Sequence, residues 1–313
     1  MKEKKKYQLE NSPLFSLKSK KKLASILFLT IEELRSLAID DSYNVYFKKV
    51  KGKKRLIEEP NGLRKKVHKR LQNLLSRIIT PDYLFSGKKG LSFVDNANSH
   101  SKNDYFLLVD IKNFYPNSNI EYIFRFFHYV LKMSEDVAWL LSEIVTISEH
   151  IPTGSPLSQL LAYFSYSTLF NKINKISLEN NIKFSLYVDD MTFSSNVPIP
   201  KNFHVFINFL LKNVGHYLKR KKTKYYSKKH YKKVTGTIIT PSHSLAIPNN
   251  KQKRIFTLKT ESKNINDIPA DKLFSLIGLL RYARQVDPSF YPEFYKKLSL
   301  QEKIINKKIT YKA

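Results

Sequence analysis

Apolar residues recur along the 313-residue chain at the spacings of both strands and helices. The continuous apolar run from Tyr105 to Val109 predicts a strand that is buried on both faces, and Pro116 ends regular pairing soon after it. Apolar residues at helical spacing follow, and we expect their side chains to lie in the core: Ile120, Ile123, Phe124, Phe127 and Leu131. Strand and helix patterns both occur along the chain, without an internal repeat, and we expect an α+β fold.

Two short apolar stretches, residues 184–188 and 191–193, flank the acidic pair Asp189 and Asp190. The pattern predicts a β-hairpin whose tight turn presents the two acids. Burying charge beside apolar strands is costly unless a cation compensates it. The hairpin therefore suggests a divalent metal site, although an Asp-Asp pair alone would also fit an ordinary turn.

The N-terminal region begins with a Lys-rich stretch, residues 1–15, that we expect to be a mobile basic tail. Basic residues 18–22 and the apolar stretch 23–31 then mimic a signal peptide, but nine apolar residues cannot span a bilayer and no small-residue cleavage site follows. We expect two short helices here instead. A capping box of Thr30 and Glu33 would open the second helix.

Two further hairpins and a helical C-terminal segment are predicted. Residues 43–47 and 55–57 would pair around a turn at 48–54, and residues 234–239 would pair with 244–247. The segment from Leu273 to Leu300 has a helical pattern, with breaks at its Asp-Pro and Tyr-Pro steps.

Asp110 closes the apolar strand, and it lies 79 residues before Asp189. The two acids can therefore meet only as neighbours on adjacent strands of one sheet. With Asp190 they would supply three carboxylates, and such oxygen ligands can hold two Mg²⁺ ions that activate a 3′-hydroxyl and stabilise a leaving pyrophosphate. Asp110 could instead cap the next segment. Metal ligation by Asp190 is a separate question. Successive residues of a strand point to opposite faces of the sheet, so the side chains of Asp189 and Asp190 would point apart.

A Pro/Gly/Ser turn, residues 152–156, passes into an apolar helical stretch that continues to about Ile176. Gly154 permits close backbone approach, and the small side chains of Ser155 and Ser158 would leave room for a nucleotide or a template base. An ordinary loop with a Ser-Pro N-cap would fit the same residues.

Composition indicates a polyanionic partner. Lys and Arg number 55 against 26 Asp and Glu, so the net charge is +29 and the pI is about 9.9. A charge of this size favours nucleic acid, and counterion release would make binding strongly salt dependent. Cysteine is absent, which excludes disulfides and zinc–thiolate sites and is compatible with a reducing cytoplasm.

Basic and aromatic residues are interleaved in one stretch, Lys219 to Lys233. Nine of its fifteen residues are Lys or Arg, three are Tyr and none is acidic. Alternating cations and rings suit phosphate contact combined with base stacking. A charged face that only meets solvent is the alternative.

Three blocks together resemble a reverse transcriptase in order, spacing and residue type: Asp110, residues 152–158, and Tyr187-Val188-Asp189-Asp190. Two elements resemble those of the bacterial retron type, namely Asn96 to His100 (Asn-Ala…His) and Val234-Thr235-Gly236 (Val-Thr-Gly). Residues 54–60 also resemble the finger strand of the family, and residues 215–223 the closing block of its palm. The likeness covers roughly residues 40–300.

The resemblance implies a right-hand polymerase with fingers, a palm built on an antiparallel sheet, and a helical thumb. The expected segments are a basic tail over 1–15, N-terminal helices and fingers over 16–104, a palm with inserted finger helices over 105–241, and an RNA-binding thumb over 242–313.

The resemblance also implies roles for individual residues. Asp110, Asp189 and Asp190 would bind two Mg²⁺ ions, and Lys222 would protonate pyrophosphate, for which a lowered pKa suits a lysine. The incoming nucleotide would meet Lys48, Arg55, Tyr115, Thr153 and Gly154, with the ring of Tyr115 under the sugar. RNA would contact Asn96, His100, Lys228, Lys229, Lys232, Lys233, Val234, Thr235, Gly236, Arg281 and Arg284. For His100 a purely structural role is the alternative, because no nucleophile accompanies it.

Two residues depart from the family pattern. Thr153 stands where the family usually has Gln, whose side chain lies against the incoming nucleotide, so nucleotide affinity or fidelity is expected to differ. Val188 replaces the Ala that is common in retron enzymes, which is a mild change in volume.

The implied activity is RNA-directed DNA synthesis from dNTPs by a cytoplasmic protein that does not enter membranes. The retron type further implies a dedicated noncoding RNA as template and primer, priming from an internal 2′-hydroxyl, and branched multicopy single-stranded DNA. It also implies an effector protein in phage defence, and host ribonuclease H, since no such domain follows the thumb. The alternatives are a group II intron-like or abortive-infection reverse transcriptase, and a non-catalytic RNA-binding scaffold.

Overall fold

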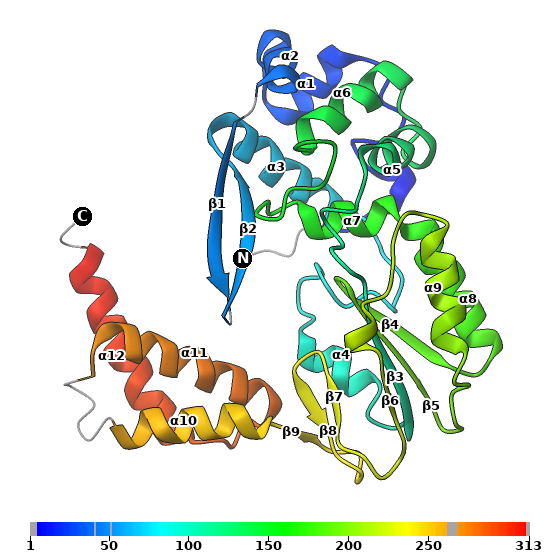
Figure 1. Cartoon of the computed structure of the whole chain (residues 1–313). Helices are drawn as coiled ribbons and strands as arrows, with labels where there is room; N and C mark the ends of the chain where they lie inside the picture. The colour runs from blue at the N-terminus through cyan, green and yellow to red at the C-terminus, as the bar shows by residue number, and fades with distance from the viewer. Residues whose placement is uncertain (1–4, 41, 51, 262–267, 311–313) are drawn as a thin grey trace. The chain divides into compact units, whose positions relative to one another are not determined.

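The computed structural model describes residues 5–40, 42–50, 52–261 and 268–310. These residues form helices and three sheets, with strand orders β1-β2, β4-β5-β3-β6 and β7-β8-β9 (Figure 1). The mixture of helices and antiparallel hairpins confirms the α+β class. None of the described helices is both long enough and apolar enough to cross a membrane.

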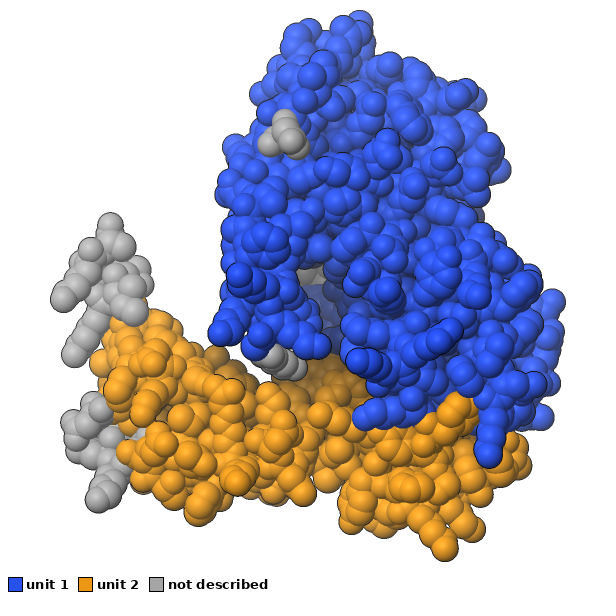
Figure 2. Space-filling view, viewed as in Figure 1, with its two compact units in different colours: residues 1–90, 107–193, 199–224 blue, residues 91–106, 194–198, 225–313 orange. Residues whose placement is uncertain are grey.

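The chain divides into two compact units (Figure 2). Unit 1 comprises residues 1–90, 107–193 and 199–224, and unit 2 comprises residues 91–106, 194–198 and 225–313. Residues 225–241, expected in the palm, belong to unit 2 by their contacts. The division into tail, fingers, palm and thumb stays a prediction.

The N-terminal segment of unit 1 is packed and not a mobile tail. The backbone N–H of Tyr7 donates to Arg77 O at 3.0 Å, and its hydroxyl donates to Leu74 O at 2.7 Å. A 3₁₀ turn, η1 (Leu9–Asn11), follows, and Leu14 is fully buried. The expectation of mobility was therefore wrong from Tyr7 onward, because the apolar residues between the lysines pack. Residues 1–4 lie outside the described part.

The two short N-terminal helices are confirmed as α1 (Lys20–Leu27) and α2 (Ile31–Ile39). Both hydrogen bonds of the capping box are present: Thr30 N donates to Glu33 Oε2 at 2.8 Å, and Glu33 N donates to Thr30 Oγ1 at 3.1 Å. Such a box satisfies two of the amides that a helix start leaves unpaired.

The first hairpin is longer than predicted. β1 (Tyr43–Val50) pairs antiparallel with β2 (Lys53–Pro60), and Lys48 lies directly opposite Arg55. Gly52, which directly precedes β2, has φ +79°, a conformation that favours glycine. The lysines that were expected in a loop extend the strands instead, because residues 44–49 and 53–56 are exposed and the charges stay in water.

The four-stranded sheet contains β3 (Tyr105–Asp110), β4 (Lys183–Tyr187), β5 (Asp190–Ser195) and β6 (Lys224–Tyr226), with β5 between β4 and β3. This order confirms that Asp110 and the acidic pair lie on neighbouring strands. Leu107, Val109, Leu186 and Phe193 are buried, so these strands belong to the core of unit 1.

Helices complete unit 1. The expected core residues after β3 are buried except Phe124, which is half-buried. The apolar stretch after residue 156 forms two helices, broken at Tyr166, rather than one. The helical elements are α3 (Gly62–Leu75), α5 (Ile120–Arg125), the π-helix η2 (Phe126–Val130), α6 (Glu135–Val145), α7 (Ser158–Ser165), α8 (Ser167–Glu179), α9 (Phe203–Lys212) and the 3₁₀ turn η3 (Arg220–Lys222).

In unit 2 the predicted strand 234–239 is interrupted by a turn. β7 (Lys232–Val234) pairs with β8 (Thr237–Ile239) across Thr235 (φ +43°) and Gly236 (φ +100°), and β8 pairs with β9 (Leu245–Ala246) as expected. Two successive residues with positive φ are typical of the type I′ turn that joins adjacent strands.

The C-terminal part of unit 2 is helical, with α10 (Asn249–Glu261), α11 (Ala270–Val286) and α12 (Pro292–Thr310). Leu273, Ile277 and Leu280 of α11 form a core with Ile255 of α10 and Leu298 of α12. The helix breaks expected at residues 287–288 and 291–292 are confirmed, with Pro292 as the first residue of α12. Unit 2 also contains α4 (Phe93–Ser99).

Candidate active site

The end of β3 carries the first acid. Phe106, Leu107 and Val109 are buried, and they bring Asp110 to a position where only 2% of the residue is exposed. The carbonyl of Asp110 accepts a hydrogen bond from Lys219 N at 2.8 Å, which joins β3 to the segment before β6. A carboxylate so deeply buried requires a compensating cation.

The turn between β4 and β5 has a backbone conformation that is uncommon for a β-branched residue, because Val188 has φ +61°. Val188 N donates to Ser86 Oγ at 3.0 Å, and Asp189 O accepts from Ile111 N at 3.0 Å. The first hydrogen bond holds the turn against Ser86, and the second holds it against Ile111, which directly follows Asp110.

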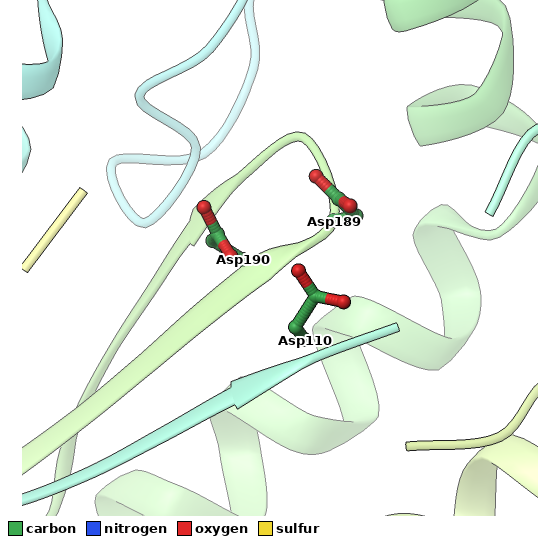
Figure 3. A group of neighbouring side chains, drawn as sticks. All are labelled: Asp110, Asp189 and Asp190. Carbon is green, nitrogen blue, oxygen red and sulfur yellow. The ribbon is translucent and has the colours of Figure 1, made fainter. Parts of the chain in front are cut away.

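The three carboxylates converge in Figure 3. One ligand oxygen from each of Asp110, Asp189 and Asp190 lies within 4.8 Å of the others. Asp190 joins the group because Asp189 lies in the turn beside Val188 rather than in a strand, so the alternation of strand faces does not separate them. The expected meeting of the three acids, which we call the acidic trio, is confirmed, and their catalytic role stays a prediction.

Burial and repulsion by neighbouring acids disfavour the charged forms of Asp189 and Asp190. Burial, followed by the charge of Asp110, raises the pKa of Asp189. Burial, followed by the charges of Asp189 and Asp110, raises the pKa of Asp190 to about 7. A cation placed among these groups would stabilise their ionised forms.

Two lysines face Asp110. Lys222 Nζ donates to Asp110 Oδ2, and Lys219 Nζ lies 3.8 Å from Asp110 Oδ1. Burial by itself lowers the pKa of Lys222, but the hydrogen bond and charge of Asp110, with the charges of Asp190 and Asp189, outweigh burial and raise that pKa. The lowered pKa expected for Lys222 is therefore not found, because the lysine pairs with the acids.

The donor set of the acidic trio fits Mg²⁺. Asp110 Oδ1 is buried and has no hydrogen-bond partner among the described residues, so an oxygen is left for a further ligand bond. Mg²⁺ is a hard cation that binds carboxylate oxygens together with substrate phosphates. Asp110, Asp189 and Asp190 are the residues that would hold it.

The raised pKa values predict how stability depends on pH. The pKa of Asp190 rises from 3.8 to about 7, so between these values the native state binds more protons than the unfolded state. Stability without divalent ions should therefore fall as pH rises from about 4 to 7. Added Mg²⁺ should raise the melting temperature most at the upper end of this window. Thermal unfolding of wild type and Asp110→Asn, with Mg²⁺ or a chelator, would test this. An equal Mg²⁺ shift in both proteins would contradict it.

Tyr115 lies half-buried, five residues after Asp110, and its ring stacks on Phe114 with centroids 5.9 Å apart. Burial, followed by the charge of Asp189, raises the pKa of its hydroxyl, which is therefore neutral at physiological pH. A bulky neutral ring within the electrostatic reach of Asp189 agrees with the position expected under a nucleotide sugar, and the role itself stays a prediction.

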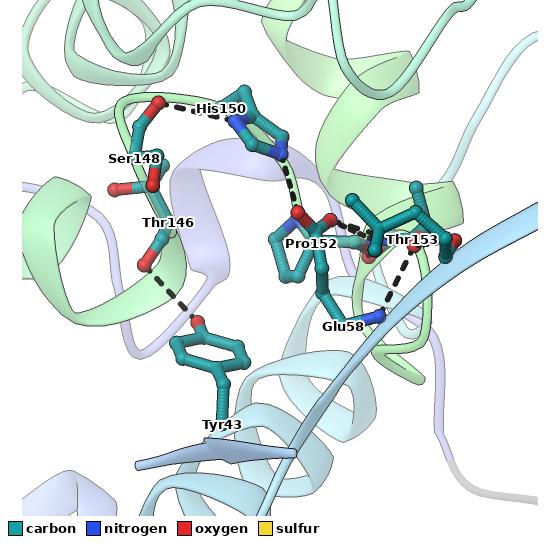
Figure 4. A network of polar contacts seen from close by, with 9 residues as sticks. Tyr43, Glu58, Thr146, Ser148, His150, Pro152 and Thr153 are labelled. Carbon is teal, nitrogen blue, oxygen red and sulfur yellow. Dashed lines mark hydrogen bonds and ion pairs between the residues drawn. The ribbon is translucent and has the colours of Figure 1, made fainter. Parts of the chain in front are cut away.

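The loop of residues 150–154 is bonded to β2 (Figure 4). Thr153 Oγ1 donates to Leu56 O at 2.8 Å and accepts from Glu58 N at 3.2 Å, and Gly154 N donates to Glu58 O at 3.0 Å. A Cβ at Gly154 would lie 2.8 Å from Glu58 O, so only glycine permits this approach. The close approach predicted at Gly154 is confirmed, but the partner is β2.

The small side chains of this loop are used for internal hydrogen bonds, contrary to expectation. Ser155 Oγ lies 2.7 Å from His68 Nδ1, and Ser158 Oγ donates to Pro152 O. Thr153, expected to face a nucleotide, is bonded to β2. Lys48 and Arg55 are exposed cross-strand neighbours on the hairpin, and no described hydrogen bond or ion pair joins either one to the acidic trio.

The two retron-like elements meet inside unit 2. Asn96 Nδ2 donates to Thr235 Oγ1 at 3.4 Å, and Thr235 Oγ1 donates to Phe93 O at 2.8 Å. The hydroxyl of Tyr282, on α11, donates to Gly236 O, and its ring stacks on Phe93 with centroids 5.2 Å apart. The Asn-Ala…His and Val-Thr-Gly elements therefore join α4, the β7–β8 turn and α11.

Three residues expected to contact RNA have no exposed surface with which to do so: Asn96, His100 and Val234. His100 Nδ1 lies 2.6 Å from Ser194 Oγ, which favours the structural role that was the alternative. Direct RNA contact by these side chains is therefore contradicted, because each is enclosed by packed neighbours. Thr235 and Gly236 are partly exposed at their turn.

The basic stretch is only partly on the surface. Lys228, Lys229 and Lys233 are exposed, whereas Lys232 is fully buried, with Nζ 3.3 Å from Lys228 O and 5.6 Å from the ring centroid of Phe106. Burial lowers the pKa of Lys232, and the charge of Asp104 opposes this. Lys232 is therefore a packed residue and was wrongly expected to bind RNA.

The two thumb arginines have partners within unit 2. Arg281 pairs with Glu302, and Arg284 lies over the ring of Tyr295 and donates to Phe290 O.

Sequence reasoning missed several residues that build the site. Ser86 fixes the Val188 turn, and Lys219 faces Asp110, yet neither stands out from its neighbours in the sequence. The buried carboxylate of Glu58 pairs with the half-buried His150, with Oε1 3.0 Å from Nε2. Nothing in the sequence distinguishes Glu58 from its neighbour Glu59 in the same strand.

Three carboxylates at the joined ends of adjacent strands, faced by lysines, are an arrangement that a metal-dependent nucleotidyl-transferring polymerase would need. The family model for reverse transcriptase (RNA-dependent DNA polymerase) matches residues 47–239. The chain belongs to this family, and within it to the bacterial retron type.

Curated relatives carry retron names. The chain is 30% identical to the Retron Se72 reverse transcriptase of Salmonella heidelberg (strain 579083-10) over 152 residues, which cover 46% of the chain and 38% of that relative. It is 23% identical to the Retron Ec86 reverse transcriptase of Escherichia coli over 314 residues, 98% of the chain and 97% of the relative. It is 24% identical to the Retron Ec83 reverse transcriptase of Escherichia coli over 228 residues, which cover 66% of the chain and 70% of that relative.

Proposed function

We propose that the protein is the RNA-directed DNA polymerase of a retron. The observation that carries the proposal is the acidic trio of Asp110, Asp189 and Asp190 at the joined ends of β3 and the β4–β5 hairpin. The names of its relatives support the retron type. A net charge of +29 suits a template and product that are both polyanions.

The residues of the site have distinct proposed roles. Mg²⁺, when bound, lowers the pKa of an attacking hydroxyl and neutralises charge on the leaving pyrophosphate. Asp110, Asp189 and Asp190 position the cations. Lys222 keeps its proton at Asp110, so it supplies positive charge and a proton donor beside the leaving group. Tyr115 excludes a 2′-hydroxyl by bulk.

The proposed template is a dedicated noncoding RNA that also serves as primer. Synthesis would start at an internal 2′-hydroxyl and give branched multicopy single-stranded DNA. The proposed setting is phage defence in the cytoplasm, with an effector protein as partner and host ribonuclease H for template removal. Sequencing the nucleic acid that co-purifies with the protein from its native host would test this. Recovery of unrelated cellular RNA alone would contradict it.

Lys228, Lys229 and Lys233 are the proposed RNA-contacting lysines of the basic stretch, with Thr235 and Gly236 beside them and Arg281 and Arg284 on α11. Phosphate contacts by these cations would fix the position of the RNA, and exposed rings such as Tyr225 and Tyr231 would stack on unpaired bases.

Changing Lys228, Lys229 and Lys233 together to Gln should weaken binding of the cognate RNA and flatten its salt dependence. Each lost phosphate contact reduces the log–log slope by about 0.7 to 0.9, so the total change is about two to three. Binding measured over a series of salt concentrations gives this slope. Synthesis on an artificially primed generic template should suffer less.

A matched control is available in unit 1, where Lys21, Lys22 and Lys66 are also exposed. Their triple Gln variant loses the same charge without touching the basic stretch. If both triple variants lose equal affinity, the basic stretch is a general electrostatic surface and the specificity assigned to it is refuted.

Two alternatives lead to different measurements. A group II intron-like or abortive-infection enzyme would polymerise DNA without a dedicated RNA bound through its 2′-hydroxyl. A non-catalytic scaffold would bind RNA with no nucleotide incorporation, but the buried and mutually repelling acids argue against it, because they destabilise a protein that makes no use of them.

A further inference from the structure

The β1–β2 hairpin is an arm attached to the rest of unit 1 at its base. Residues 44–49 and 53–56 are exposed, and burial begins at Ile57. At the base, the hydroxyl of Tyr43 donates to Thr146 O at 3.1 Å, and Glu58 is only 3% exposed. The orientation of the arm therefore depends on a few contacts of Tyr43 and Glu58.

Glu58 contacts the loop of residues 150–154 through its side chain and its backbone (Figure 4). One carboxylate oxygen, Oε2, accepts from Thr153 N at 3.1 Å and from Thr153 Oγ1 at 3.4 Å, and the other lies 3.0 Å from His150 Nε2. The backbone of Glu58 donates to Thr153 and accepts from Gly154. Strand and loop are thus joined by a network centred on one buried acid.

His150 also belongs to this network through both of its ring nitrogens. Nδ1 lies 3.1 Å from the carbonyl oxygen of Ser148, and Nε2 lies 3.0 Å from Oε1 of Glu58, the carboxylate oxygen that Thr153 does not contact. The ring therefore connects Glu58 to a second part of the loop.

We propose that Glu58, acting with Thr153 and His150, is a positioning residue that sets the arm for nucleotide binding. The inference rests on the proposed function, since it takes the triphosphate of a dNTP as the group that Arg55 and Lys48 meet. Arg55 lies three residues from Glu58, about 10 Å along the strand. A rotation of about 6° at the base would move Arg55 by about 1 Å, and a hydrogen bond or ion contact with a triphosphate weakens over a displacement of that size.

The Thr at position 153 fits this role. Its hydroxyl accepts from Glu58 N, and its one proton is shared between Leu56 O and Glu58 Oε2, so every described hydrogen bond of the hydroxyl is with β2. In this proposal, Thr153 affects nucleotide binding by positioning the arm, and its own side chain does not contact the nucleotide.

Thr153→Val and Thr153→Ser form a matched pair, because Val keeps the shape of Thr without its hydroxyl and Ser keeps the hydroxyl. On a primed RNA template, Val should raise the KM for dNTP about tenfold with kcat within about twofold, the equivalent of about 1.4 kcal/mol. Ser should restore the KM to within about twofold of wild type. Equal KM values in the two variants, or a fall in kcat alone, would overturn the proposal.

The double variant with Glu58→Gln tests whether the contacts act as one unit. Gln keeps an acceptor for Thr153 but loses the charge that faces His150. If Glu58 and Thr153 share one function, the double variant raises the KM by clearly less than the product of the two single effects. A KM equal to that product would show independent contributions and overturn the proposal.

Stability and activity are separated by a control and a second readout. Ile173→Val removes a fully buried methylene group within α8, so it should lower the melting temperature without changing the KM. In Thr153→Val, the Glu58 amide should exchange with deuterium faster, because its acceptor is gone. Unchanged exchange would overturn the proposal even without an activity assay. A wild type that incorporates no dNTP would instead refute the proposed function.

Discussion

Replacing Asp189 by Asn should reduce dNTP incorporation on an RNA template by at least about a thousandfold. The metal ions of a polymerase stabilise transition-state charge by several kcal/mol, and each 1.36 kcal/mol is tenfold in rate. Asn offers one neutral oxygen where the acidic trio needs a carboxylate, so both cation affinity and alignment are lost. Primer extension with Mg²⁺ measures the effect.

RNA affinity should stay within about twofold in this variant, and the protein should remain folded. Removing one of three crowded charges relieves the repulsion that raises the pKa of Asp190, so the fold gains rather than loses stability without metal. Asp82→Asn, at an exposed loop position, provides the matched control and should polymerise normally. If Asp189→Asn retains a large fraction of wild-type synthesis, the acidic trio is not the catalytic site.

Replacing Tyr115 by Ala should lower discrimination between dNTP and rNTP by about 10- to 100-fold. The half-buried ring stacks on Phe114, and its truncation leaves a cavity beside the place proposed for the sugar. Removing one steric constraint in a pocket changes selectivity by about that factor. The ratio of kcat/KM for the two nucleotide types is the quantity to measure.

Tyr115→Phe separates the ring from its hydroxyl. If bulk alone excludes the ribose 2′-hydroxyl, the Phe variant discriminates like wild type while the Ala variant does not. Unchanged discrimination in Tyr115→Ala would place the gate at another residue.

Elements with a strong local signal were predictable from the sequence. The capping box of Thr30 and Glu33 fixes the start of α2, and the apolar runs around Asp189 fix a hairpin. The turn at Thr235 and Gly236 was missed because Thr seldom adopts positive φ, and only its pairing across β7 and β8 selects that conformation. Helix α10 was also missed, since Ile255 is its one fully buried described residue.

The acidic trio could be predicted because each acid directly follows or lies between apolar strand patterns, while the pairing of Asp110 with Asp189 across 79 residues rested on the resemblance to a reverse transcriptase. The partners of the loop at residues 150–154 could not, since Glu58 lies 95 residues before Thr153 and nothing in the sequence links them. Which lysines are buried could not be predicted either. Lys232 and Lys233 have the same sequence surroundings, but side chains alternate along a strand, so Lys232 is buried and Lys233 is exposed.

The arm formed by β1 and β2 has a consequence for solubility. Its sheet has two strands in the described chain, so each strand keeps an unpaired edge, and Val45, Tyr46, Phe47 and Leu56 are exposed along it. Exposed apolar edges invite pairing between copies and aggregation. Lys48, Lys49, Lys53, Lys54 and Arg55 line the same edges, and their repulsion opposes such pairing. The charges proposed to meet a nucleotide therefore also keep separate molecules of the protein apart.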